Sequence, residues 1–168
     1  VICSAILGND GLRAEPHSRG SESVNLWIWR HLRMNLPDDW ELLQYTKEAA
    51  EGRCAFGDRY RIRLELSWRH TGARPDLQRS ISDYIAKLDS EEIMKDAAEV
   101  EAAGWVGLDG HMGELRNTRF MRYLPREEVA VQAVLLWPEG RDEELEASIL
   151  RGIRDERVSA GRVRRWRA

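Results

Sequence analysis

The sequence predicts an α+β domain in which an antiparallel β-sheet is flanked by helices, as in an α/β/α sandwich. Most predicted strands are separated by short turns, few segments have helical spacing, and strand–helix–strand units are rare. The chain has 168 residues, of which 42% are hydrophobic and 33% are charged. This length and composition are typical of one globular domain with a substantial core.

Residues 60–69 form the clearest predicted strand. Ile62, Leu64, Leu66 and Trp68 face one way, and Arg61, Arg63, Glu65 and Ser67 face the other. This alternation indicates one buried side and one side open to solvent. Residues 128–137 are largely apolar on both faces, which predicts a strand in the centre of the sheet.

Further strands have less regular patterns. Leu26, Ile28, Leu32 and Met34 share one parity, which predicts a single strand that ends before a turn at residues 36–39. Other strands are expected at 40–46, 53–56, 105–108 and 115–123. The last two form a hairpin around a glycine-containing turn at 109–113.

Two segments have the spacing of amphipathic helices. Pro75 and Asp76 open the first, and its apolar stripe consists of Leu77, Ile81, Tyr84, Ile85 and Leu88. The second follows Asp142, a suitable N-cap residue, and repeats Leu145, Ile149 and Ile153 every four residues. Residues 91–103 are rich in good helix formers and predict a third helix.

The same patterns divide the chain into three parts. Residues 1–23 predict a disordered or loosely packed arm, and residues 24–155 predict the single α+β domain. Residues 156–168 are either a basic tail or the start of a further, repeated domain, because residues 162–167 and 27–30 share an alternation of tryptophan and arginine.

Composition disfavours several classes of function. The net charge of −3 and the pI of about 5.9 do not indicate a surface for nucleic acid or membranes. No segment has the run of about 20 apolar residues that a membrane helix needs. Cys3 and Cys54 are too few for a disulfide framework, which favours a reducing, cytoplasmic setting. Five arginines within residues 157–167 leave contact with phosphates as a weak alternative.

The order of elements and several punctuating residues resemble a known superfamily. The chain contains Leu36-Pro37 before Trp40, a helix start at Asp76, and Trp137-Pro138 at the end of a strand. Over residues 24–155 this layout resembles the superfamily of PsbP-like and Ran-binding Mog-like proteins. The resemblance implies an α/β/α sandwich around an antiparallel sheet. It also implies a binding or accessory role on larger assemblies, without an active site.

The seven tryptophans are the most unusual feature of the composition, and six of them lie at or beside predicted strands. Most of them are expected in the core. Trp27 and Trp29, however, point away from Ile28, and with Arg61 and Arg63 they could form an aromatic–arginine surface. Tryptophan and arginine are enriched in interface hot spots, so these four residues are candidates for binding an unidentified protein partner. The chain itself is expected to be a monomer or a homodimer.

Residues 109–114 provide the alternative site. Asp109, His111 and Glu114 lie close together on the predicted hairpin loop and could hold a metal ion or share a proton. A hairpin turn alone also explains the Asp-Gly pair. No phosphate loop, dinucleotide-binding motif or nucleophile elbow is present, so no cofactor is expected. A non-catalytic interaction domain is therefore favoured over an enzyme.

Overall fold

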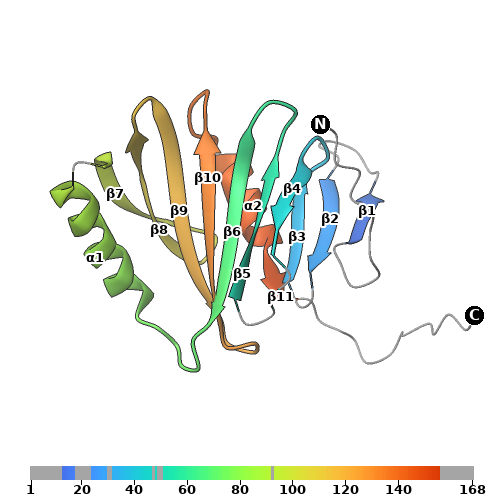
Figure 1. Cartoon of the computed structure of the whole chain (residues 1–168), viewed down its shortest axis with the longest axis horizontal. Helices are drawn as coiled ribbons and strands as arrows, with labels where there is room; N and C mark the ends of the chain where they lie inside the picture. Colours follow the sequence, from blue (N-terminus) through green and yellow to red (C-terminus); the bar gives the residue numbers. More distant parts are fainter. Residues whose placement is uncertain are drawn as a thin grey trace, which may run out of the picture.

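The computed structural model describes residues 13–17, 24–29, 32–46, 48, 51–91 and 93–155. It has an α+β architecture, with a seven-stranded antiparallel sheet, a smaller sheet built around a hairpin, and two helices (Figure 1). In spatial order the large sheet consists of β4 (Glu41–Tyr45), β5 (Glu51–Gly57), β6 (Ile62–His70), β10 (Val129–Trp137), β9 (Leu115–Leu124), β8 (Trp105–Met112) and β7 (Lys95–Ala102). The predicted central strand, β10, lies fourth of seven.

The small sheet packs against one face of the large sheet. Its four strands are, in spatial order, β1 (Arg13–His17), β2 (Val24–Trp29), β3 (Leu32–Pro37) and β11 (Arg154–Asp155). The second helix, α2 (Glu143–Gly152), packs against β3 on this same side of the molecule. The large sheet therefore has the hairpin β2–β3 and α2 on one face.

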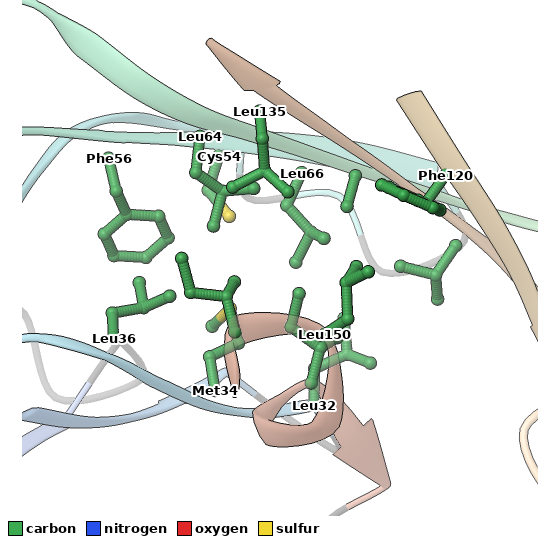
Figure 2. Close-up of a cluster of buried hydrophobic side chains, with 14 of the residues drawn as sticks. Leu32, Met34, Leu36, Cys54, Phe56, Leu64, Leu66, Phe120, Leu135 and Leu150 are labelled. Atoms are coloured by element: carbon green, nitrogen blue, oxygen red, sulfur yellow. The ribbon is translucent and has the colours of Figure 1, made fainter. Parts of the chain in front are cut away.

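The main hydrophobic core fills the space between these layers. Figure 2 shows Leu32, Met34 and Leu36 of β3 facing Phe56, Leu64 and Leu135 of the large sheet, with Leu150 of α2 beside them. Four of the predicted core tryptophans are buried in this cluster, which confirms that expectation for Trp40, Trp68, Trp105 and Trp137. The indole nitrogen of Trp105 also donates a hydrogen bond of 3.1 Å to the Leu150 carbonyl, which ties α2 to β8.

The first helix, α1 (Leu77–Ser90), packs on the opposite face of the large sheet. Ile81 and Leu88 are buried against Leu108 of β8 and Met94, in a cluster separate from the main core. The predicted apolar stripe of this helix is thus confirmed. The helix begins at Leu77, two residues after the expected start at Pro75, and Asp76 is its N-cap, whose side chain accepts a hydrogen bond of 3.1 Å from the Arg79 amide. No described helix is long and apolar enough to cross a membrane.

The prediction of one strand from Leu26 to Met34 is wrong, because the chain reverses between Trp29 and Leu32 and forms the hairpin β2–β3. The reversal changes the parity of the second strand. Trp27 is paired with Met34 and shares its face, whereas Leu26 is paired with Asn35 on the other face. Since side chains alternate between faces, an undetected turn assigns half of the hairpin to the wrong side of the sheet.

The helix predicted at 91–103 is also wrong, because residues 95–102 form the edge strand β7. Its helix-forming residues pair with β8 from Ala98 to Ala102, and Val100 and Ala102 pack against the main core. Tertiary pairing here outweighs the small differences in local propensity. The predicted turn at 109–113 is likewise shorter than expected: β8 continues to Met112, and the chain turns at Gly113 and Glu114.

The ends of the chain are described in part. Strand β1 lies within residues 1–23, for which a loosely packed arm was expected, and it pairs with β2 in antiparallel register. The other residues of that segment lie outside the described part of the chain, as do residues 156–168. The last described element, β11, pairs with Arg33 and Leu32 of β3.

Candidate functional site

The candidate site lies on the face of the large sheet that carries α1. The helix packs on β7, β8 and β9, so the same face of β5, β6 and β10 lies beside the helix rather than beneath it (Figure 1). Leu64, Leu66 and Val131 point into the main core on the other side. Because strand side chains alternate, their chain neighbours form the surface beside α1.

Strand register assembles two rows of side chains on this surface. The first row crosses β5, β6, β10 and β9 and consists of Arg53, Ser67, Gln132 and Met121. The second row crosses the same four strands and consists of Ala55, Glu65, Val134 and Arg119. Residues far apart in sequence therefore stand as direct cross-strand neighbours.

A groove with a volume of about 760 Å³ lies over the first row, and all four residues of that row line it. Its floor includes the short side chains of Ser67 and Ala130, and its wall on the helix side includes Leu77 and Ser80. A second hollow of about 240 Å³ shares Arg53, Ser67 and Gln132 with the groove and extends to Glu65 and Arg119. Short residues on the sheet beside a raised helix explain why the surface is hollow at this place.

The charges around the smaller hollow are not balanced. Arg119 is half-buried, and its NH1 donates a hydrogen bond of 2.6 Å to the Tyr84 hydroxyl, while its guanidinium lies 4.8 Å from the centre of the Tyr84 ring. Its Nε is buried and has no hydrogen-bond partner among the described residues. Arg53 is exposed, and within the described ranges no carboxylate forms an ion pair with either arginine.

A second polar cluster, on the opposite face, attaches α2 to the sheet. Arg141 bridges two acids: its NH1 lies 3.1 Å from Oδ2 of Asp109, and its NH2 lies 2.5 Å from Oε1 of Glu146. Glu146 is 1% exposed and also accepts a hydrogen bond of 2.6 Å from the Thr118 hydroxyl. That hydroxyl in turn accepts a hydrogen bond of 3.0 Å from the Trp137 indole. Each charge in this cluster has a partner, which is typical of a structural contact.

Among the described groups with displaced pKa values, two are carboxyl groups and one is a thiol. Burial disfavours the ionised form of Asp109, but hydrogen bonds from Arg116 and the charge of Arg141 outweigh it, so its pKa lies below the usual value. The pKa of Asp58 is also lowered, because the amides of Tyr60 and Arg61 and the Arg63 guanidinium outweigh its burial. Burial raises the pKa of the Cys54 thiol to about 12, so this cysteine is an inert core residue.

The predicted metal-binding residues do not share one environment. The Asp109 carboxylate is held by Arg116 and Arg141, at 2.6 and 3.1 Å. His111 is half-buried further along β8, and Glu114 is exposed in the tight turn. In the described part of the chain no three residues of the types that bind metals gather into a site. A metal role for these residues stays a prediction, and it would require Asp109 to leave its arginines.

The predicted partner-binding residues are also separated. Trp27 is half-buried, and its ring meets that of Phe56 edge-on with centroids 5.2 Å apart. The side chain of Trp29 lies outside the described part of the chain. Arg61 is exposed, whereas Arg63 forms an ion pair of 2.8 Å with Asp58 and lies over the Trp40 ring. A partner-binding role for these four stays a prediction, and two of them already have intramolecular partners.

One residue pattern in the sequence indicates the groove. Gln132 is the only polar residue between Val129 and Trp137, and a lone amide in an otherwise apolar strand points to a local opening in the cover of that face. Ser67 and Glu65 were assigned correctly to the solvent side of β6. Their position beside Gln132 and Arg53 depends on strand order, which a single sequence does not reveal.

Comparisons with known proteins identify no family. No family model and no curated protein matches the chain. Among solved structures, the chain is similar to a crystal structure of a protein from Bacteroides thetaiotaomicron, with a TM-score of 0.45 and 12% sequence identity. The match covers 76% of this chain and 46% of the other, so the chain spans less than half the length of that protein. Similarity at this level carries no conclusion about function.

Proposed function

We propose that the chain is a non-catalytic interaction domain that binds a segment of a protein partner in the groove on the α1 side of the large sheet. The groove of about 760 Å³, built on the cross-strand rows of β5, β6 and β10, is the observation that carries this proposal. The proposal keeps the expected class of function but places the binding surface away from Trp27 and Trp29.

The lining of the groove suits an extended peptide. The Gln132 amide carries both donors and an acceptor and can pair with a peptide group, and the Ser67 hydroxyl can do the same. Leu77 and Met121 provide apolar surface on the helix side. In an extended chain successive side chains point to opposite sides, so such a segment could place its polar groups on the polar strip and apolar side chains against the apolar wall.

Two observations favour a binding role over catalysis. Asp58 and Asp109, the described acids with displaced pKa values, are each held by arginine. Cys54 has a raised pKa, whereas a nucleophilic thiol needs a lowered one. The groove itself is lined by side chains suited to hydrogen bonding and packing.

The resemblance to the PsbP-like and Mog-like superfamily belongs to the same proposal. The resemblance is supported by the arrangement of the elements, an antiparallel sheet with α1 on one face and α2 on the other. Members of that superfamily dock onto larger assemblies, so this resemblance and the groove favour the same class of function. A cytoplasmic setting is also part of the proposal.

Site-specific crosslinking tests the groove as the binding surface. A photoreactive benzoylphenylalanine replaces Glu48, an exposed residue at the rim of the groove, in cells that naturally produce the chain. We expect a protein adduct that disappears when Ser67→Phe fills the floor. The matched control Ala86→Phe adds the same ring on the exposed side of α1 and should leave the adduct unchanged. An adduct that survives Ser67→Phe, in a variant with unchanged thermal unfolding, would contradict the proposal.

A further inference from the structure

Building on the proposed function, we infer that the smaller hollow of about 240 Å³ is a carboxylate-binding pocket for an aspartate or glutamate side chain of the partner segment. Arg119 and Arg53 supply the positive charge, and Ser67 and Gln132 supply neutral hydrogen-bond donors. The partner segment must therefore carry an acidic side chain, whereas the groove alone would accept segments of many different sequences.

Arg119 provides the strongest support for an anion-binding site. A guanidinium that is removed from water loses solvation and normally gains a carboxylate in return. Arg119 has the hydroxyl and ring of Tyr84 instead, and its buried Nε donates to no described residue. Arg141, on the other face, shows the usual arrangement, with the carboxylates of Asp109, Glu143 and Glu146 around one guanidinium. A carboxylate in the hollow would give Arg119 the kind of ionic partner that Arg141 already has.

The two arginines approach the hollow from opposite sides. Arg53 is on β5 and Arg119 is on β9, with β6 and β10 between them. Three strand spacings and an offset of two residues along the strands separate their backbones by about 16 Å, a distance that leaves room for a side-chain carboxylate between two long guanidinium side chains. Ser67 and Gln132 lie on the intervening strands and line the same hollow.

Glu65 decides the kind of anion. It is exposed and lines the hollow between the two arginines, so the three charged side chains sum to one positive charge. A carboxylate neutralises that charge, whereas a phosphate, with a charge of about −2, would leave an excess negative charge beside Glu65. The planar guanidinium fork also fits the two oxygens of a carboxylate.

Titration of the whole chain with short blocked peptides tests the pocket. The probe is acetyl-Ala-Glu-Ala-amide, compared with acetyl-Ala-Gln-Ala-amide, and binding is followed in ¹⁵N–¹H spectra that include the arginine Nε–H signals. We expect the glutamate peptide to shift the Arg119 Nε–H and the backbone amides of Ser67 and Gln132 in a saturable way. It should bind about tenfold tighter than the glutamine peptide, as a charge-assisted hydrogen bond implies.

Two arginine variants and one control variant show which side chains bind the carboxylate of the glutamate peptide. Arg119→Gln should weaken binding of the glutamate peptide about tenfold. Arg53→Gln provides a second test, at an exposed arginine, if the Arg119 variant does not fold. Arg126→Gln, in the exposed β9–β10 turn, should leave binding unchanged. Equal affinity for the two peptides, no saturable shift at the solubility limit, or tighter binding of inorganic phosphate would each overturn the carboxylate pocket.

The outcomes separate this inference from the proposed function. If the peptide fails to bind while Ser67→Phe still removes the crosslinked adduct, the interaction domain stands and the carboxylate pocket falls. If Ser67→Phe leaves the adduct in place, the proposed groove falls whatever the peptide does. A peptide that shifts Arg119 without any partner adduct would instead support a pocket for small carboxylates.

Discussion

At Asp109, two guanidinium groups share one carboxylate. Arg116 donates from Nε at 3.0 Å and from NH2 at 2.6 Å, while Arg141 donates from NH1 at 3.1 Å and continues to Glu146. The cluster alternates in sign, so each partly buried charge has an opposite neighbour. Arg119, across the sheet, lacks such a neighbour among the described residues. This difference separates a structural contact from the candidate binding pocket.

The paired state of Asp109 predicts a dependence of stability on pH. Its pKa in the folded protein is lowered, so its contribution to the free energy of unfolding is present above the unfolded pKa of about 3.9. That contribution is lost as the pH falls through the lower, folded-state pKa. We expect Asp109→Asn to reduce the free energy of unfolding by about 2 kcal/mol at pH 7 and to reduce its loss on acidification. Urea unfolding at neutral and acidic pH measures both quantities.

Glu139→Gln is the control for that experiment, because Glu139 is exposed in the turn after β10. It removes an acid of the same charge without removing a paired carboxylate, and its effect should be within about 0.5 kcal/mol. If the gap between the wild type and Asp109→Asn stayed constant down to strongly acidic pH, ionisation of Asp109 would not be the source of the stabilisation.

At the scale of elements, the pairing of β8 and β9 depends on a glycine beneath an aromatic ring. Gly107 stands opposite Phe120, whose side chain belongs to the main core. A Cβ atom at Gly107 would lie 2.3 Å from the Arg119 carbonyl oxygen and 2.6 Å from the Phe120 ring. The glycine therefore allows the ring to lie across the strand, a known way of stabilising glycine within sheets.

Gly107→Ala should destabilise the protein through this overlap. The new methyl group would push β8 away from β9 or displace Phe120, at a cost of about 1–3 kcal/mol in the free energy of unfolding. Gly104→Ala is the matched control, because its added Cβ meets open space and only its positive φ of 77° opposes alanine. That strain costs about 1 kcal/mol. Chemical unfolding measures the free energy of unfolding of both variants. A smaller loss for Gly107→Ala than for Gly104→Ala would contradict the steric overlap.

Strand β7, at one edge of the large sheet, is irregular. Strand β7 was expected to be helical because its residues are good helix formers, and its pairing with β8 shifts register between Lys95 and Ala98. Asp96, in this shift, has a positive φ of 56°. Such an irregular edge discourages pairing with another sheet. The local sequence shows the helix propensity of this segment, but it does not show that pairing with a neighbouring strand overrides that propensity.

For the whole molecule, the large sheet separates two hydrophobic clusters of unequal extent. The main core joins the hairpin β2–β3, α2 and most strands of the large sheet, whereas the cluster under α1 is built around Ile81, Leu88, Met94 and Leu108. Regions with less buried apolar surface open at lower free energy. We therefore expect α1 to open locally before the sheet unfolds.

Native-state hydrogen exchange measures this order. Ile81→Ala should speed exchange in α1 while β6 and β10 keep their protection, because local opening does not expose the main core. Val131→Ala, on the fully buried side of β10, should lower protection throughout by about 2 kcal/mol. If Ile81→Ala lowered protection equally in α1 and β10, the molecule would unfold as a single unit. Opening of α1 bears on the proposed function, because the first turn of the helix forms one wall of the groove.

Taken alone, the sequence determined the features that depend on a few neighbouring residues. The alternation of residues 60–69 identified the buried and open faces of β6, and the apolar run of 128–137 identified the central strand. The stripe from Leu77 to Leu88 and the cap at Asp142 identified both helices. These patterns succeed because burial of one face imposes a period on the local sequence.

Only the tertiary structure decided which surfaces come together. The reversal after Trp29 turned Trp27 toward Phe56, and pairing with β8 turned a helix-forming segment into β7. The smaller hollow joins Arg53, Ser67, Gln132 and Arg119 from four strands whose order is not encoded in any local period. A period shows which face of an element is buried, but contacts between distant segments set the register and the part of the sheet that a helix covers.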